Sequence, residues 1–112
     1  MIRAAPFVVA LLASGVAGAQ APAPEPAHVS VVLNCDGLPA PLPVVFVAGE
    51  PPTALLDWQG LPVTLEGAAT GVDRRMRYAA RLDAGLLAIT AGQDEADLQS
   101  PGAPLRYCRV QR

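Results

Sequence analysis

The sequence predicts an all-β domain of seven or eight short strands, arranged as a small antiparallel barrel or sandwich and closed by one disulfide. Three observations support this fold class. Short apolar or alternating segments are separated by turn residues at the spacing typical of antiparallel sheets. These segments occupy only residues 28–112, a region small enough to need a covalent link for stability. Two cysteines, Cys35 and Cys108, lie near the two ends of this region.

Each expected strand is bounded by residues that favour turns. The first alternates, with Val29 and Val31 on one face, and the second is an apolar run that ends at a Gly-Glu-Pro-Pro sequence. Gln59-Gly60 and Asp83-Ala84-Gly85 indicate hairpins. Residues 76–87 are also compatible with a helix, because Ala, Arg and Leu favour one. The expected strands are 28–35, 43–47, 53–58, 61–65, 76–82, 86–90, 95–99 and 105–110.

Residues 1–20 have the composition of an export signal peptide. Arg3 supplies the positive start, Pro6–Val16 is an apolar run too short to span a bilayer comfortably, and Ala17-Gly18-Ala19 forms a small-x-small cleavage site. No cysteine follows the run that could accept a lipid, and residues 21–27 form a Pro/Ala-rich spacer. We expect a soluble protein without a membrane anchor, in the periplasm or secreted; the alternative is an uncleaved anchor.

In an exported domain of this size, Cys35 and Cys108 are expected to form a disulfide. The bond would join the first and last expected strands. It would close a loop of about 74 residues, which in the chain-entropy model stabilises the fold by roughly 4.4 kcal/mol. The alternative is a pair of free cysteines in the core.

Composition and motifs favour a binding protein over an enzyme. The only histidine is His28, and neither Ser30 nor Ser100 lies in a nucleophile motif. No metal-ligand cluster, glycine-rich phosphate loop or dinucleotide motif is present, so no cofactor is expected. Residues 94–97 are better explained as a solvated acidic turn than as paired carboxylates for glycoside chemistry.

The charge balance excludes one class of partner and suits another. The chain has no lysine, and loss of Arg3 with the signal leaves seven of its eight arginines against ten acidic residues. This acidity argues against a nucleic-acid ligand and suits a basic protein partner.

The segment Thr70–Arg77 places three arginines directly after a glycine-containing loop, and Arg81 follows. On a strand, Arg75, Arg77 and Arg81 would share one face. An arginine fork can bind a carboxylate at two points. The alternative is a solvated face whose arginines pair with local acids, namely Asp73, Asp83 and Glu66.

The order of short motifs resembles one known family. The matching parts are Cys35, the strand at 44–47, Ala54-Leu55-Leu56 before Trp58-Gln59-Gly60, Leu65–Gly71, Gly92–Leu98 and Tyr107-Cys108. This order resembles the inhibitors of c-type lysozyme in Gram-negative bacteria known as MliC and PliC. The resemblance covers residues 28–112. It implies an eight-stranded antiparallel barrel in the cell envelope that blocks a c-type lysozyme by inserting a loop into the active-site cleft.

The resemblance also implies which residues contact lysozyme. In the family, a loop serine and a turn lysine reach the catalytic carboxylates. Thr70 stands at the serine position, Ala91 at the lysine position, Arg74 where the family has tyrosine and Ile89 where it has tryptophan. The implied lysozyme-binding loop is Thr70, Gly71, Asp73, Arg74, Arg75 and Arg77, with Ala91 and Gly92 in a second turn.

The loop arginines are expected to replace the charge of the missing lysine, and Arg74 or Arg75 would enter the cleft. Two points stay open. One alternative function is a non-inhibitory envelope β-barrel of the same fold that binds another ligand or partner. The oligomeric state is also open, with a homodimer as one outcome.

Overall fold

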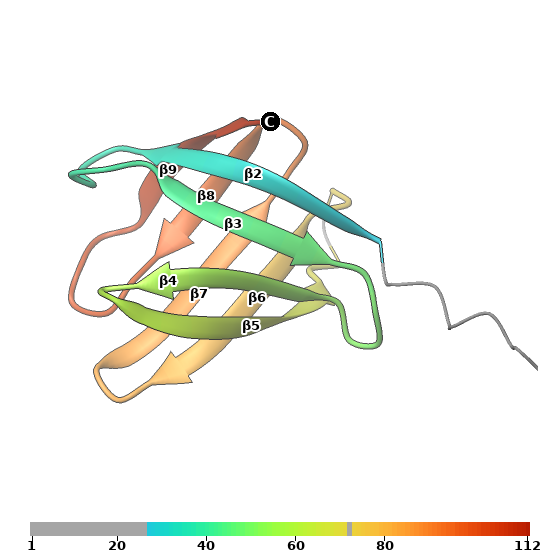
Figure 1. Ribbon diagram of the computed structural model, residues 1–112, viewed down its shortest axis with the longest axis horizontal. Helices are drawn as coiled ribbons and strands as arrows, with labels where there is room; N and C mark the ends of the chain where they lie inside the picture. Colours follow the sequence, from blue (N-terminus) through green and yellow to red (C-terminus); the bar gives the residue numbers. More distant parts are fainter. Residues whose placement is uncertain (1–26, 72) are drawn as a thin grey trace, which may run out of the picture.

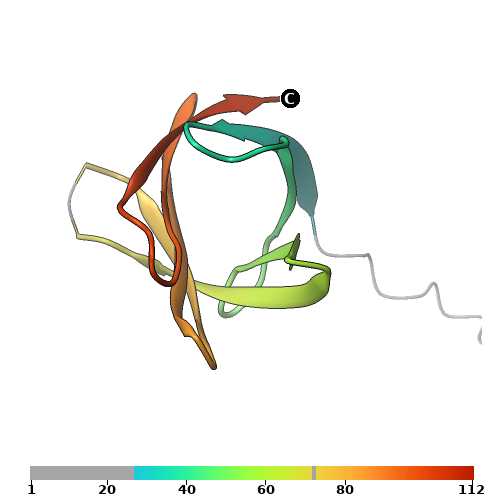
Figure 2. The ribbon, with the colours of Figure 1, turned by 90° about the vertical axis from the view of Figure 1, so that its left-hand side faces the viewer.

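The computed structural model describes residues 27–71 and 73–112, in which eight antiparallel strands close into one barrel (Figures 1 and 2). Each strand pairs with the next along the chain, and the last pairs with the first. The strands are β2 (His28–Cys35), β3 (Leu42–Val47), β4 (Thr53–Trp58), β5 (Leu61–Ala69), β6 (Met76–Leu82), β7 (Gly85–Ala91), β8 (Glu95–Gln99) and β9 (Arg106–Gln111).

This architecture confirms the all-β barrel with its disulfide, and residues 76–82 form a strand rather than a helix. The expected signal peptide, residues 1–20, and spacer residues 21–26 lie outside the described residues. No helix in the part of the chain that the structure describes is long and apolar enough to cross a membrane.

Strands β3, β5, β7 and β9 differ in their bounds from the sequence-based expectation, β3 and β9 by one residue at one or both ends. Strand β5 continues beyond Leu65 to Ala69, because Glu66–Ala69 pairs with Met76–Ala79 of β6. Strand β7 begins at Gly85, which pairs with Leu82. The β6–β7 hairpin turn is therefore the two residues between them, in place of the three expected.

Buried and more exposed residues alternate along strands such as β4 and β9, because alternate side chains point into the barrel, whereas β7 buries three consecutive residues, Leu87–Ile89. Fully burying a large apolar side chain stabilises a fold by about 1.5–3 kcal/mol. The buried core consists of Val31, Leu33, Leu42, Val44, Ala54, Leu56, Leu65, Tyr78, Leu87, Ile89, Ala96, Leu98 and Cys108.

The connections of the barrel alternate between its two ends. The loop end carries residues 48–52, 70–71 with 73–75, and 92–94. The disulfide end carries residues 36–41, 59–60, 83–84 and 100–105, whose turns lie on the left in Figure 1. The barrel therefore presents two separate surfaces, one at each end.

The disulfide crosses the seam that closes the barrel. Cys35 and Cys108 face each other in the register of β2 and β9, and their Cα atoms are 3.9 Å apart. Cys108 is fully buried. The expected pairing of the first strand with the last is thus confirmed, and the bond holds β2 to β9 near the disulfide end.

An aromatic pair fills the interior toward the loop end. Tyr78 lies directly opposite Gly67 in the β5–β6 register, and its ring centroid is 5.0 Å from that of Phe46. A Cβ atom on Gly67 would lie 2.6 Å from Cε2 of Tyr78. The tyrosine ring therefore packs over Gly67 on the neighbouring strand, in the space that a larger side chain at residue 67 would occupy.

Candidate functional site

The loop between β5 and β6 turns through three left-handed residues. Gly71, Asp73 and Arg74 have φ angles of 79°, 50° and 63°. The Thr70 amide donates a hydrogen bond to the Arg75 carbonyl oxygen at 3.2 Å, which closes the base of the loop. Non-glycine residues adopt such angles infrequently. Arg74 is consequently carried on a turned, exposed stretch beyond the end of the sheet.

The structure brings this loop against the second predicted turn. The Gly92 amide donates to the Glu95 carbonyl oxygen at 2.8 Å, which forms the turn between β7 and β8. The Nε atom of Arg75 lies 3.9 Å from the position that a Cβ on Gly92 would occupy. Ala91 is half-buried and pairs with Met76 at the start of β6. The two segments chosen from the sequence thus form one surface at the loop end.

Arg75 is held by two carboxylates. Its Nη1 atom lies 3.1 Å from Oδ2 of Asp97 on β8, and its Nε atom lies 4.0 Å from Oδ1 of Asp73 in the loop. The Arg75 and Asp97 side chains are each about one-third exposed, at 32% and 33%. Pairs this exposed contribute about 0–1 kcal/mol. These pairs orient the loop, and the two carboxylates neutralise the charge of Arg75.

The other arginines of the segment differ in their partners. Arg77 donates from Nη2 to Oε1 of Gln99 at 3.4 Å. It shares the outer face of β6 with Arg81, as expected, but Arg75, expected on the same face, lies before the strand begins. Within the described residues, the exposed Arg74 side chain has neither an ion pair nor a side-chain hydrogen bond. Neither Arg74 nor Arg77 forms an ion pair in the described residues, and of the two only Arg74 also lacks a side-chain hydrogen bond there.

Of the three acidic residues considered as local partners of these arginines, only one forms an ion pair in the described part of the chain. Asp73 pairs with Arg75, whereas Asp83 and Glu66 form no ion pair with an arginine in the described part of the chain. Asp97, the closer partner of Arg75, was not predicted. Its position could be found only from the register, in which Arg77, Thr90 and Asp97 lie side by side across three strands.

An apolar pocket of about 470 Å³ opens beside this surface. Phe46, Met76 and Tyr78 form part of its wall, and burial raises the pKa of Tyr78 above its usual value. Arg112 stands at the pocket and donates from Nη2 to the Gln93 carbonyl oxygen at 2.9 Å. The loop end thus combines an exposed cation with an adjacent apolar hollow.

His28 and Ser100, considered as a base and a nucleophile, lie at opposite ends of the barrel. His28 begins β2 at the loop end, and Ser100 follows β8 at the disulfide end, where it is buried. In the described ranges, no group of three or more His, Cys, Asp and Glu residues could hold a metal ion.

Comparison with known proteins identified no similar protein. No model of a known protein family matches the chain, and no match is found among the curated proteins or among the solved structures.

Proposed function

We propose that the protein is an exported inhibitor of a c-type lysozyme, located in the periplasm or secreted by a Gram-negative bacterium, and that its loop 70–77 enters the active-site cleft. One observation carries this proposal. The loop and the turn at Ala91-Gly92, which the family resemblance selects as the contact segments, lie side by side at the loop end, where Arg75 lies against Gly92. The motif order described above and the eight-stranded barrel support the same function.

The loop residues divide into two roles under this proposal. Arg74 is the probe, because it is exposed in the loop and, unlike Arg77, forms neither an ion pair nor a side-chain hydrogen bond within the described residues. Arg75 is a positioning residue, because Asp97 and Asp73 already hold its guanidinium. A two-point contact from Arg74 to a cleft carboxylate would replace the contact of the family's lysine. The acidic remainder of the chain would complement a lysozyme that is basic outside its cleft.

A titration against hen-type lysozyme tests the proposal. The purified protein should slow lysis of bacterial cells, and Arg74→Ala should weaken binding by about 2–5 kcal/mol, since a buried cleft carboxylate would be left unpaired. Arg81→Ala is the matched control, because Arg81 is also exposed but lies toward the disulfide end of β6. Its substitution should cost well under about 1 kcal/mol.

Two outcomes would contradict the proposal at different levels. If the unsubstituted protein does not bind at moderate salt, inhibition fails for that lysozyme. If it binds but Arg74→Ala and Arg75→Ala are both silent, the assignment of the loop arginines is wrong.

The second candidate is a non-inhibitory envelope barrel that binds another ligand or partner. Two features of the contact surface favour this candidate. Ala91 stands where the family has a positively charged lysine, and the positive charge of Arg75 is neutralised by Asp97. This candidate predicts no binding to any c-type lysozyme, together with an intact fold.

A further inference from the structure

A second candidate binding site lies at the disulfide end, away from the loop 70–77. An open pocket of about 450 Å³ is lined by Arg106 together with residues 37–42, residues 57–59 at the end of β4, and Ser100, Pro101 and Ala103. We call it the Arg106 pocket. No residue of this pocket belongs to the surface proposed for lysozyme.

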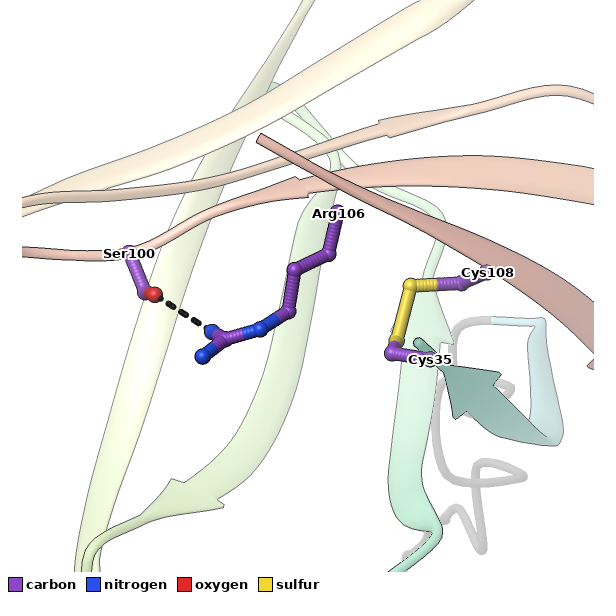
Figure 3. The surroundings of a disulfide bond; sticks show 4 residues. All are labelled: Cys35, Ser100, Arg106 and Cys108. Carbon is purple, nitrogen blue, oxygen red and sulfur yellow. Dashed lines mark hydrogen bonds between the residues drawn. A yellow bond between two sulfur atoms is a disulfide. The ribbon is translucent and has the colours of Figure 1, made fainter. Parts of the chain in front are cut away.

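The alternation of side chains along β9 directs the Arg106 side chain toward the barrel interior. Arg106 is two residues before Cys108, whose side chain is fully buried, so both residues point to the same side of the strand. Figure 3 shows the Arg106 side chain extending from β9 toward Ser100, beside the Cys35–Cys108 disulfide. The Nη1 atom donates to Oγ of Ser100 at 2.9 Å, and Ser100 is only 4% exposed.

The charge of Arg106 is not neutralised within the described residues. A half-buried guanidinium has five donors, and the only side-chain acceptor that it reaches there is the uncharged Ser100 hydroxyl. Asp57 also lines the pocket, but it lies on the exposed face of β4 and forms no ion pair with Arg106. Because Arg106 lines the pocket and has N–H donors left over, an anion in the pocket would find hydrogen-bond donors there.

The wall of the pocket adds an aromatic surface. Trp58, the only tryptophan of the chain, is half-buried at the end of β4 and lines the pocket together with Pro39, Pro41 and Pro101. It also lines an adjoining pocket of about 460 Å³. A ligand that occupies the Arg106 pocket would thus contact both a guanidinium and an indole.

We propose that the Arg106 pocket binds a small carboxylic acid that carries an apolar ring face. The carboxylate accepts two hydrogen bonds from the Arg106 fork, and the Ser100 hydroxyl, which accepts from Arg106, has its own proton left to donate. The ring lies against Trp58. The ring is either aromatic or that of an acidic sugar, and binding is independent of the lysozyme proposal because the two sites lie at opposite ends of the barrel.

Fluorescence of Trp58 tests the proposal directly, because no other tryptophan contributes to the signal. The purified protein is titrated with benzoate and with N-acetylmuramic acid, up to about 10 mM. N-acetylglucosamine is the matched neutral sugar, and inorganic phosphate is the anion without a ring. A saturable change with either acid, absent with the neutral sugar and with phosphate, is expected. No saturable change with either acid, or an equal response to the neutral sugar or phosphate, would overturn the proposal.

Substitutions then assign the site. Arg106→Gln should weaken binding by about 10- to 100-fold, which is the loss of hydrogen bonds to a charged group. Arg109→Gln is the matched control, because Arg109 lies on the exposed face of the same strand, and it should bind as the unsubstituted protein does. Equal affinity of Arg106→Gln and the unsubstituted protein would contradict the assignment.

A measurement on the unsubstituted protein covers the case in which Arg106→Gln does not fold. Backbone amide shifts on addition of the acid should be concentrated at Trp58, Ser100 and Arg106. Shifts confined to residues 70–75 and 91–94 would place the ligand at the loop end and overturn the inference.

Discussion

The two ends of the barrel place an arginine in opposite ways. At the disulfide end, Arg106 is in phase with the buried Cys108 and lies within a pocket, where it donates to buried Ser100. At the loop end, Arg74 lies beyond the strand on a left-handed turn and is exposed. The first placement suits a small ligand that comes to the protein. The second suits a protein partner whose own cleft surrounds the arginine.

The ends also differ in what holds them together. A covalent bond joins β2 to β9 near the disulfide end, whereas the loop end depends on one exposed ion pair network around Arg75 and on the packing of Tyr78 over Gly67. The loop end should therefore respond to small changes in packing and charge, and the whole barrel to loss of the disulfide.

The largest effect is expected from removal of the disulfide. Replacing both Cys35 and Cys108 with alanine should lower the free energy of unfolding by about 4 kcal/mol, because the unfolded chain is no longer constrained. Urea denaturation measures this change. The double variant should be insensitive to reductant, which serves as the control. A loss of under about 1 kcal/mol would show that the seam is held mainly by β2–β9 pairing.

The next effect concerns the packing at the loop end. Gly67→Ala should lower the free energy of unfolding by about 1–3 kcal/mol, because its Cβ would lie 2.6 Å from Cε2 of Tyr78 and 3.1 Å from the Pro52 carbonyl oxygen. Gly49→Ala is the control, since the nearest atom to its Cβ would be 3.4 Å away. Equal urea midpoints for the two variants would contradict this account.

A smaller effect is expected from the ion pair of the loop. Arg75→Ala or Asp97→Ala should each change the free energy of unfolding by less than about 1 kcal/mol, because both side chains are about one-third exposed. Hydrogen exchange of the Thr70 amide, which bonds to the Arg75 carbonyl, should become faster in both variants. Unchanged exchange would mean that the ion pair does not order the loop.

The smallest effect is confined to alkaline pH. Burial raises the pKa of Tyr78, so the unfolded state loses this proton first as the pH rises. Stability is fully retained below the ordinary tyrosine pKa of about 10 and falls between that value and the raised pKa. Tyr78→Phe should remove this decline in urea midpoints, and Tyr107→Phe, whose ring is exposed, should retain it. The chain has no lysine or free thiol to obscure the effect.

Most of the fold could be predicted from the sequence, because the period of two and the turn residues are local signals. The extension of β5 through Glu66–Ala69 could not, since Gly and Ala are weak strand formers and these residues pair only because β6 lies beside them. The disulfide followed from the number and position of the cysteines.

The candidate site was predictable only in part. The sequence selected both segments at the loop end, but not their contact through Arg75 and Gly92 or the pairing with Asp97, which depend on the register across β7. Arg106 was missed altogether, although its spacing from Cys108 is a usable signal, because a residue two positions from a buried cysteine on a strand shares its side.

The closure of the barrel by β2 and β9 has a practical consequence for engineering. With an even number of antiparallel strands, β2 begins and β9 ends at the loop end, and the C-terminus in Figure 1 lies next to β2. Arg112 also donates to the Gln93 carbonyl oxygen, so an affinity tag, fluorophore or surface linkage at the C-terminus would crowd the turn between β7 and β8, whereas β2 begins across the barrel mouth from the loop 70–77 (Figure 2). Immobilisation through an added cysteine in the β6–β7 turn, at Asp83 or Ala84, would leave that face open to a partner in solution.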